Sequence, residues 1–136
     1  MPFVLDTHVW LWAAEGMDRI GDSERTVIDA AHANREVFVS VISIWEIAHL
    51  DRRGRIRLSL PCAEWVNRAL YLRPIELVEL TRDIAIAAAQ LPGPIHGDPM
   101  DRFIAATARV IGATLVTRDR RLLAYGRLGY VDVLEA

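Results

Sequence analysis

The sequence predicts an α/β fold in which a mostly parallel sheet carries helices on both faces. Short apolar runs alternate with longer segments of helical periodicity, which is typical of strand–helix–strand units. Glycine and proline separate these segments, and we find no linker, internal repeat or low-complexity tract between them. A chain of 136 residues is long enough to bury one core, so we expect a single domain over residues 1–136.

The N-terminal half begins with a short apolar run that ends at Asp6, and this favours a strand followed by a helix start. A later segment places Val27, Ile28 and Ala31 on one helical face, with charged residues elsewhere. The expected elements are a strand at 3–5, helices at 7–14 and 23–34, a strand at 37–39, a nearly apolar helix at 41–50 and an extended stretch at 55–60 in which arginine alternates with apolar residues.

The C-terminal half continues the same alternation. An alanine-rich run indicates a helix, and Gly112 closes the helix before the last buried strand. The expected elements are helices at 62–72, 82–91, 100–111 and 120–125 and strands at 75–80, 114–117 and 130–133.

Composition excludes several classes of protein. The chain is 52% apolar and 25% charged with a formal net charge of -2, so it is neither disordered nor strongly basic. The single cysteine, Cys62, cannot form a disulfide within the chain. No segment reaches the roughly 18 apolar residues of a membrane helix, and the N-terminus lacks the basic start of a signal peptide. We therefore expect a cytoplasmic protein that does not bind a membrane.

Acidic residues follow the predicted strands, where ligands bind in open parallel sheets. Asp6 follows the first strand, Asp98 and Asp101 open a helix, and Asp119 follows the buried strand near the C-terminus. Helix capping is the alternative role for Asp6, Asp98 and Asp119, because a carboxylate accepts a hydrogen bond from a free backbone N–H. Both roles need a carboxylate at a strand–helix junction, so one residue can serve in both.

Glu46 is the acid that capping does not explain. It lies in the middle of the helix predicted at 41–50, three residues after Ser43, and the two share a narrow polar stripe on an otherwise apolar helix. A buried carboxylate is costly unless it is paired or binds a metal. A salt bridge to an arginine is the alternative. We favour a metal- or water-binding role for Glu46, supported by Ser43, because other acids are expected nearby.

Four carboxylates at one edge of a sheet repel one another unless a cation offsets their charge. Mg²⁺ or Mn²⁺ suits such a site, because both ions prefer carboxylate oxygens and retain several waters. Ions of this kind support phosphodiester hydrolysis. Zinc does not fit, since the chain has 1 cysteine and its 4 histidines show no close ligand spacing. We interpret each histidine as a surface or packing residue.

A family resemblance rests on four segments that occur in order along nearly the whole chain. They are 5–12 (LDTHVWLW), 40–48 (SVISIWEIA), 96–103 (HGDPMDRF) and 115–119 (LVTRD), with a shorter match at 54–56. Together they are similar to the motifs of PIN-domain proteins, and above all to those of the VapC toxins of bacterial type II toxin–antitoxin modules. The sequence departs from the family pattern at Met100, where an aromatic residue is common, and at 51–53, where a lysine is usual.

The resemblance implies a PIN-like three-layer α/β/α fold and an endoribonuclease that depends on Mg²⁺ or Mn²⁺. It also implies a VapB-like antitoxin protein that blocks the active site, and a homodimer or toxin–antitoxin hetero-oligomer. By position, the acidic quartet of the family corresponds to Asp6, Glu46, Asp101 and Asp119. Asp98 matches a frequent neighbouring acid, and Thr117 matches a common hydroxyl position beside the last acid.

The basic residues are 16 arginines, and the chain has no lysine. A guanidinium group matches phosphate oxygens, so we expect some of these arginines to contact RNA. Solvated charges that pair with acids are the alternative. The candidates for RNA contact are Arg55, Arg57, Arg102, Arg118 and Arg120.

The tryptophans give a weaker indication. Trp45 lies on the predicted apolar helix, and we expect it in the core rather than in a base-stacking platform. Trp10 and Trp12 lie on a short helix with Val9 and Leu11, and these four cannot all face the core. We expect the exposed ones to form a dimer or antitoxin surface.

Two other functions are weighed against a nuclease. An aspartyl-phosphate phosphatase or receiver-like domain would use Asp6 as its nucleophile, but His8 stands where the phosphatase form has a second aspartate. A non-catalytic RNA- or protein-binding module would use the acids only as helix caps, and this leaves Glu46 unexplained.

Overall fold

Five parallel strands form the sheet of the computed structural model, which describes residues 1–17 and 19–136. Their spatial order is β3–β2–β1–β4–β5, and each neighbouring pair is parallel. The predicted α/β class is confirmed, and the described sheet is parallel throughout. The strands are β1 (Phe3–Leu5), β2 (Val37–Ser40), β3 (Glu76–Val78), β4 (Thr114–Thr117) and β5 (Val133–Glu135).

Helices connect each strand to the next, and most begin or end within two residues of the expected position. Side-chain oxygens of Asp6, Ser40, Asp98 and Asp119 accept hydrogen bonds from first-turn backbone N–H groups, so all four are helix caps. In the described residues, no helix is both long and apolar enough to cross a membrane. The helices are α1 (Thr7–Ala14), α2 (Asp22–Ala33), α3 (Val41–Arg52), α4 (Cys62–Tyr71), α5 (Arg82–Ala89), α6 (Pro99–Ile111) and α7 (Arg120–Arg127).

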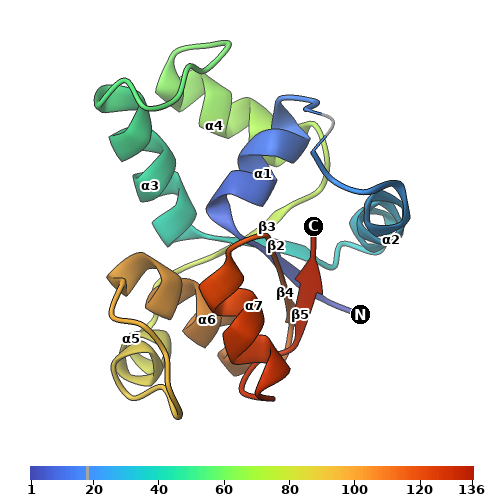
Figure 1. The fold of residues 1–136 in the computed structure, drawn as a ribbon. Helices are drawn as coiled ribbons and strands as arrows, with labels where there is room; N and C mark the ends of the chain where they lie inside the picture. Colours follow the sequence, from blue (N-terminus) through green and yellow to red (C-terminus); the bar gives the residue numbers. More distant parts are fainter. Residues whose placement is uncertain (18) are drawn as a thin grey trace.

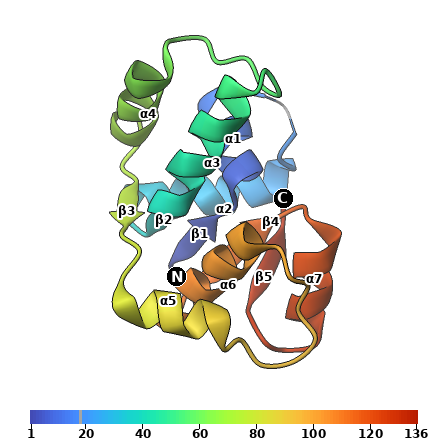
Figure 2. The ribbon, with the colours of Figure 1, turned by 90° about the vertical axis from the view of Figure 1, so that its left-hand side faces the viewer.

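The sheet separates two hydrophobic clusters, because successive strand residues point to opposite faces. Phe3 and Leu5 of β1 face the cluster under α1 to α4, whereas Val4 between them faces the cluster under α5 to α7. Figure 1 shows α1, α3 and α4 on one side of the sheet and α5, α6 and α7 on the other, and Figure 2 shows the same layers after a quarter turn. The result is a three-layer α/β/α arrangement.

The strand order reverses direction at β1, which lies between β2 and β4. Connections from β1 lead one way to β2 and β3, whereas β4 and β5 lie on the other side of β1. Ligands of open α/β sheets bind at the carboxyl ends of the strands at such a reversal. Asp6 directly follows β1, Ser40 is the last residue of β2, and Asp119 lies shortly after the end of β4. The predicted acids Asp6 and Asp119 therefore lie at this edge of the sheet.

One predicted extended stretch and one predicted strand differ from the structure. The stretch at 55–60 is an irregular connection between α3 and α4. The predicted alternation of side chains is nevertheless present: the arginines are exposed, and the apolar residues between them pack on the first hydrophobic cluster. It runs beside helices, where no strand edge is available to pair with it (Figure 1). The last strand begins at Val133 rather than Tyr130, because the Tyr130 ring stacks on Tyr125 of α7, with 5.1 Å between ring centroids.

Candidate functional site

Asp6 is held by hydrogen bonds to both of its carboxylate oxygens. Oδ1 accepts from the backbone N–H of Thr7 at 2.9 Å, and Oδ2 accepts from Oγ1 of Thr117 at 2.7 Å. Thr117 is the last residue of β4 and is fully buried. Both oxygens of Asp6 are thus fixed in direction, and each keeps a further lone pair that can bind a ligand.

Thr117 also contacts Asp119, the last acid of the predicted quartet. Its Oγ1 accepts a hydrogen bond from the backbone N–H of Asp119 at 3.0 Å while it donates to Asp6. Asp119 caps α7, and its Oδ1 accepts from two backbone N–H groups of the first turn at 2.8 and 3.1 Å. The predicted supporting residue Thr117 therefore links β1 to the start of α7.

Glu46 is brought towards this edge by a buried contact between α1 and α3. Oγ1 of Thr7 donates to Oγ of Ser43 at 2.9 Å, and both side chains are almost fully buried. Ser43 therefore lies where the polar stripe was predicted, one helical turn from Glu46. Glu46 itself is only partly buried.

The expectation that Trp45 lies in the core is wrong. Its side chain is 54% exposed, and its ring stacks on His49 one turn later, with 4.7 Å between ring centroids. Only Ser43 and Ile47 of α3 are fully buried, and they lie four residues apart on the face towards α1. Trp45 points away from that face, because a helix buries only the stripe that meets its neighbours. Trp10, by contrast, is buried.

Asp101 lies in the first turn of α6 and has two cationic or polar neighbours. Its Oδ2 lies 2.7 Å from Nε2 of His96 and 3.7 Å from Nη2 of Arg121. The same Arg121 nitrogen lies 3.8 Å from Oδ2 of Asp119, so one guanidinium group lies near two acids. Burial raises the pKa of Asp101, and the charges of Asp98 and Asp119 raise it further, while the hydrogen bond to His96 opposes the shift.

The pKa of Asp6 is raised from 3.8 to about 6. Burial of the carboxyl group is the largest cause of the rise, and the hydrogen bond from Thr117 opposes it. The negative charges of Asp101 and Glu46 contribute to the rise. A carboxyl group with its pKa raised by burial and by like charges is typical of a functional site.

The side chains at this edge of the sheet suit a hard divalent cation, because carboxylate oxygens are the ligands that such ions prefer. Four carboxylates from separate elements lie there, close enough for their negative charges to interact. Among residues 1–17 and 19–136, however, no three ligand-type side chains already converge as a metal cluster. Arg121 and His96 contact Oδ2 of Asp101. Further acidic side chains would therefore have to turn towards a cation for it to bind.

The five arginines predicted to contact RNA are in two different situations. Arg55, Arg57 and Arg120 are exposed. Arg102 donates to two carbonyl oxygens in the last turn of α5 at 3.0 and 3.2 Å. Arg118 donates to the carbonyl of the last residue at 2.9 and 3.2 Å, and its guanidinium group lies 5.1 Å from the ring centroid of Trp12. Contact with RNA is untested for all five, and we keep the exposed Arg55, Arg57 and Arg120 as candidates because Arg102 and Arg118 are engaged within the chain.

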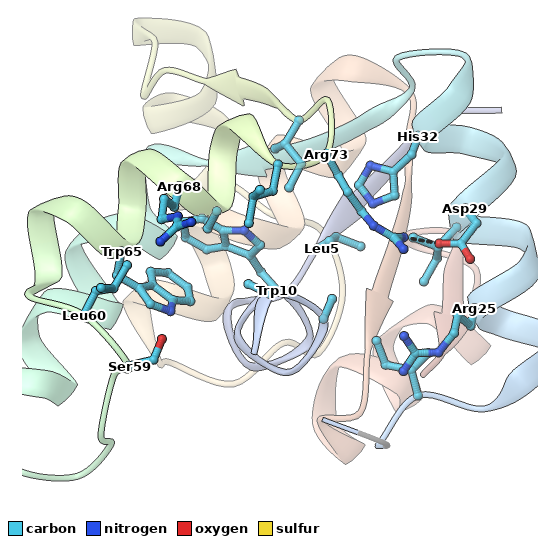
Figure 3. A pocket seen from close by; sticks show the side chains of 17 residues that line it. Leu5, Trp10, Arg25, Asp29, His32, Ser59, Leu60, Trp65, Arg68 and Arg73 are labelled. Atoms are coloured by element: carbon cyan, nitrogen blue, oxygen red, sulfur yellow. Dashed lines mark hydrogen bonds and ion pairs between the residues drawn. The ribbon is translucent and has the colours of Figure 1, made fainter. Parts of the chain in front are cut away.

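A separate cavity of about 390 Å³ lies between α1, α2 and α4, and contains none of the predicted site residues. Its wall is apolar and includes Trp10 and Trp65, and a hydrogen bond between Arg73 and Asp29 crosses its rim (Figure 3). Nε1 of Trp10 has no hydrogen-bond partner among the described residues. Sequence reasoning did not predict this cavity, which forms where α4 packs near the consecutive helices α1 and α2.

Comparison with known proteins agrees with the geometry. The family model of the PIN domain matches residues 3–128. The chain belongs to the PIN-domain family. The PIN domain described here is also 36% identical over 122 residues to Ribonuclease VapC22 of Mycobacterium tuberculosis (strain ATCC 25618 / H37Rv), and the match covers 90% of each chain. It is thus a homologue of a VapC ribonuclease, as the sequence motifs predicted.

Solved structures show the same PIN fold at low sequence identity. The crystal structure of VapBC2 from Rickettsia felis, bound to a DNA fragment from its promoter, contains a chain that matches with a TM-score of 0.69 and 19% identity, over 99% of this chain and 98% of that one. The DNA-bound VapBC of Salmonella typhimurium matches with a TM-score of 0.66 and 17% identity over the same shares. Each comparison supports the observed α/β/α fold.

His96 is the site residue that sequence reasoning missed. Each histidine was interpreted as surface or packing because no metal-ligand spacing was present. The available signal was its position in the segment 96–103, five residues before Asp101 and ahead of the helix start. Arg121 was likewise left out of the site residues, although it follows Asp119 closely.

Proposed function

We propose that this PIN domain, residues 1–136, is the toxic endoribonuclease of a type II toxin–antitoxin module and hydrolyses RNA phosphodiester bonds. The observation that carries the proposal is that Asp6, Asp101 and Glu46 come together at the carboxyl edge of the sheet, where burial and these like charges raise the pKa of Asp6. The relationship to a VapC ribonuclease supports the same reaction.

Mg²⁺ or Mn²⁺ is the cofactor that we propose, with Asp6, Glu46, Asp101 and Asp119 as its ligands, directly or through water. Asp98, which caps α6, is a neighbouring acid that adds negative charge. When bound, such a cation activates a water and neutralises the charge that builds up on the phosphate.

The chain's own residues orient these ligands. Thr117 fixes one oxygen of Asp6 by a hydrogen bond, and the Thr7–Ser43 contact fixes α3 against α1. Both contacts lie in buried surroundings, where rigid neighbours hold a ligand better than mobile ones. Exposed arginines, Arg55, Arg57 and Arg120, are the proposed contacts to RNA phosphates.

The proposed partners follow from the family. A VapB-like antitoxin protein would block the active site, and the chain would assemble as a homodimer or a toxin–antitoxin hetero-oligomer. Chains similar in fold come from structures of VapBC complexes. We propose a cytoplasmic location for the assembly.

RNA cleavage with and without the cation tests the proposal. We expect cleavage in Mg²⁺, none in EDTA, and losses of at least about a hundredfold in the Asp6→Asn and Asp101→Asn variants. Asp132→Asn, an exposed aspartate in the connection to β5, is the matched control and should cleave normally. Cleavage that persists in EDTA and in both site variants would exclude a metal-dependent nuclease.

A further inference from the structure

The contact between His96 and Asp101 is the feature of the acidic edge that no other role explains. Nε2 of His96 lies 2.7 Å from Oδ2 of Asp101, and the two side chains are only 16% and 14% exposed. A carboxylate can only accept a hydrogen bond, so Nε2 carries the hydrogen and donates. Charge-assisted contacts of this length are strong, particularly where water is largely excluded.

The loop that carries His96 is fixed in place by residues far along the chain. The hydroxyl of Tyr125 donates to the carbonyl of Pro92, and the Tyr130 ring stacks on Tyr125. Gly93 lies against that ring: its φ is +74°, and a Cβ there would lie 2.4 Å from a Tyr130 carbon. No other residue type fits this approach without displacement. The loop is therefore packed, and His96 approaches Asp101 from a rigid support.

Asp101 is also fixed from its other side. The next residue, Arg102, donates to two carbonyl oxygens in the last turn of α5, which ties the first turn of α6 to that helix. Asp98 caps the same turn through the backbone N–H of Met100 at 3.0 Å. The backbone of Asp101 is thus anchored, and the remaining freedom lies in the rotation of its carboxylate.

The hydrogen bond from His96 restricts the rotation of the Asp101 carboxylate, and it involves only one of the two carboxylate oxygens. In the part of the chain that the structure describes, the hydrogen bond from His96 and the ion pair with Arg121 both involve Oδ2. Oδ1 of Asp101 has no hydrogen-bond partner there. A carboxylate held by one oxygen presents the other in a defined direction, which is how outer contacts orient metal ligands.

We propose that His96 is a positioning residue that fixes the carboxylate of Asp101 by a hydrogen bond, so that Oδ1 remains available to the divalent cation. This inference rests on the proposed function, because it takes Asp101 as a cation ligand. It assigns His96 no contact with the cation or the RNA. The positioning role requires a side-chain N–H donor at the place that Nε2 of His96 occupies.

Binding of Mn²⁺ to the full chain without RNA tests this role. The free-ion signal in electron paramagnetic resonance falls as Mn²⁺ binds, so affinity is measured without turnover. We expect His96→Ala to weaken Mn²⁺ binding about tenfold, which is the usual effect of removing an outer contact. His96→Gln keeps a side-chain N–H donor and should bind within about threefold of the parent. His49→Ala, on α3 and stacked on Trp45, is the matched control and should bind like the parent.

Three outcomes would overturn the proposal, and they are distinguishable. Parental affinity in His96→Ala, with affinity lost in Asp101→Asn, would refute the positioning role and leave Asp101 as a ligand. Parental affinity in both variants would refute the ligand role of Asp101, and with it the positioning role. Equal loss in His96→Ala and His96→Gln, both folded by circular dichroism, would mean that the ring itself is required. If His96→Ala does not fold, His96→Asn, whose shorter amide does not reach Asp101, replaces it with the same expected loss.

Discussion

The hydroxyl of Thr117 donates a hydrogen bond of 2.7 Å to Oδ2 of Asp6, although the two residues are 111 positions apart in the chain. The contact joins the ends of β4 and β1 at the point where the strand order reverses. The same hydroxyl accepts from the backbone N–H of Asp119. One buried side chain therefore connects two acids of the proposed quartet and keeps their separation fixed.

Replacing Thr117 with valine should destabilise the protein by about 1–3 kcal/mol. Valine has the same shape but leaves the Asp6 carboxylate and the Asp119 N–H without this partner in a buried place. Thr117→Ser, which keeps the hydroxyl, should lose clearly less. Urea denaturation measures the free energy of unfolding of both variants. A near-parental Thr117→Val together with a clear loss in Thr117→Ser would show that the methyl group, not the hydrogen bond, matters at this position.

Removing the charge of Asp6 should stabilise the metal-free protein at neutral pH. The pKa of Asp6 is about 6 in the fold against 3.8 for the ordinary group, so the folded state holds this proton more tightly than the unfolded chain. The resulting stabilisation is complete below pH 3.8 and is lost as the pH rises through about 6. In EDTA at neutral pH, Asp6→Asn should therefore gain up to about 3 kcal/mol relative to the parent, less what it loses because its amide has one acceptor oxygen where the carboxylate accepts two hydrogen bonds.

Thermal unfolding between pH 5 and 8 in EDTA checks this expectation. The advantage of Asp6→Asn should grow with pH across the window near 6. Adding Mg²⁺ should raise the unfolding temperature of the parent and not that of the variant, because a ligand that binds only the folded state stabilises it. Asp132→Asn, exposed and distant along the chain, should follow the parent. A pH-independent difference between Asp6→Asn and the parent would contradict the assigned pKa.

Two tryptophans should respond very differently to the same truncation. Trp65 is only 3% exposed and its Nε1 donates to Glu15 at 3.0 Å, so Trp65→Ala should cost about 3–5 kcal/mol. Trp45 is 54% exposed, so Trp45→Ala should cost below about 1 kcal/mol. Chemical denaturation followed by circular dichroism measures both. A large loss in Trp45→Ala would show that its face is buried in the molecule in solution.

Substitution of Arg118 should change folding stability, whereas substitution of Arg120 should change RNA binding. Arg120 is exposed, so Arg120→Ala should lower the slope of log affinity against log salt by about 0.7, the value for one phosphate contact on a single strand. Arg118 holds the last residue and lies over Trp12, so Arg118→Ala should cost about 1 kcal/mol of folding stability and leave the salt slope unchanged. Filter binding at several salt concentrations measures the slope. The reverse pattern would place the phosphate contact at Arg118.

The sequence by itself determined the elements and the chemistry of the site. Strand β4 and helix α1 have the predicted bounds, because an apolar run and a capping aspartate act locally. Asp6 and Asp119 were predicted for the same reason: both follow a strand, and the order of strands brings these strand ends together at one edge of the sheet. Burial raises the pKa of Asp6 and of Asp101, and the negative charges of neighbouring acids raise both further.

Only the tertiary structure decided which faces of these elements meet. The sequence of a nearly apolar helix does not show which of its sides will pack against neighbouring elements. In the structure, α3 buries the face of Ser43 and Ile47 and leaves Trp45 exposed. Likewise, His96 contacts Asp101 because aromatic residues of α7 and the following segment hold its loop. These contacts join residues that are distant in sequence or lie in irregular loops. Periodicity and capping describe neighbours along the chain, whereas such contacts depend on how separately formed elements pack together.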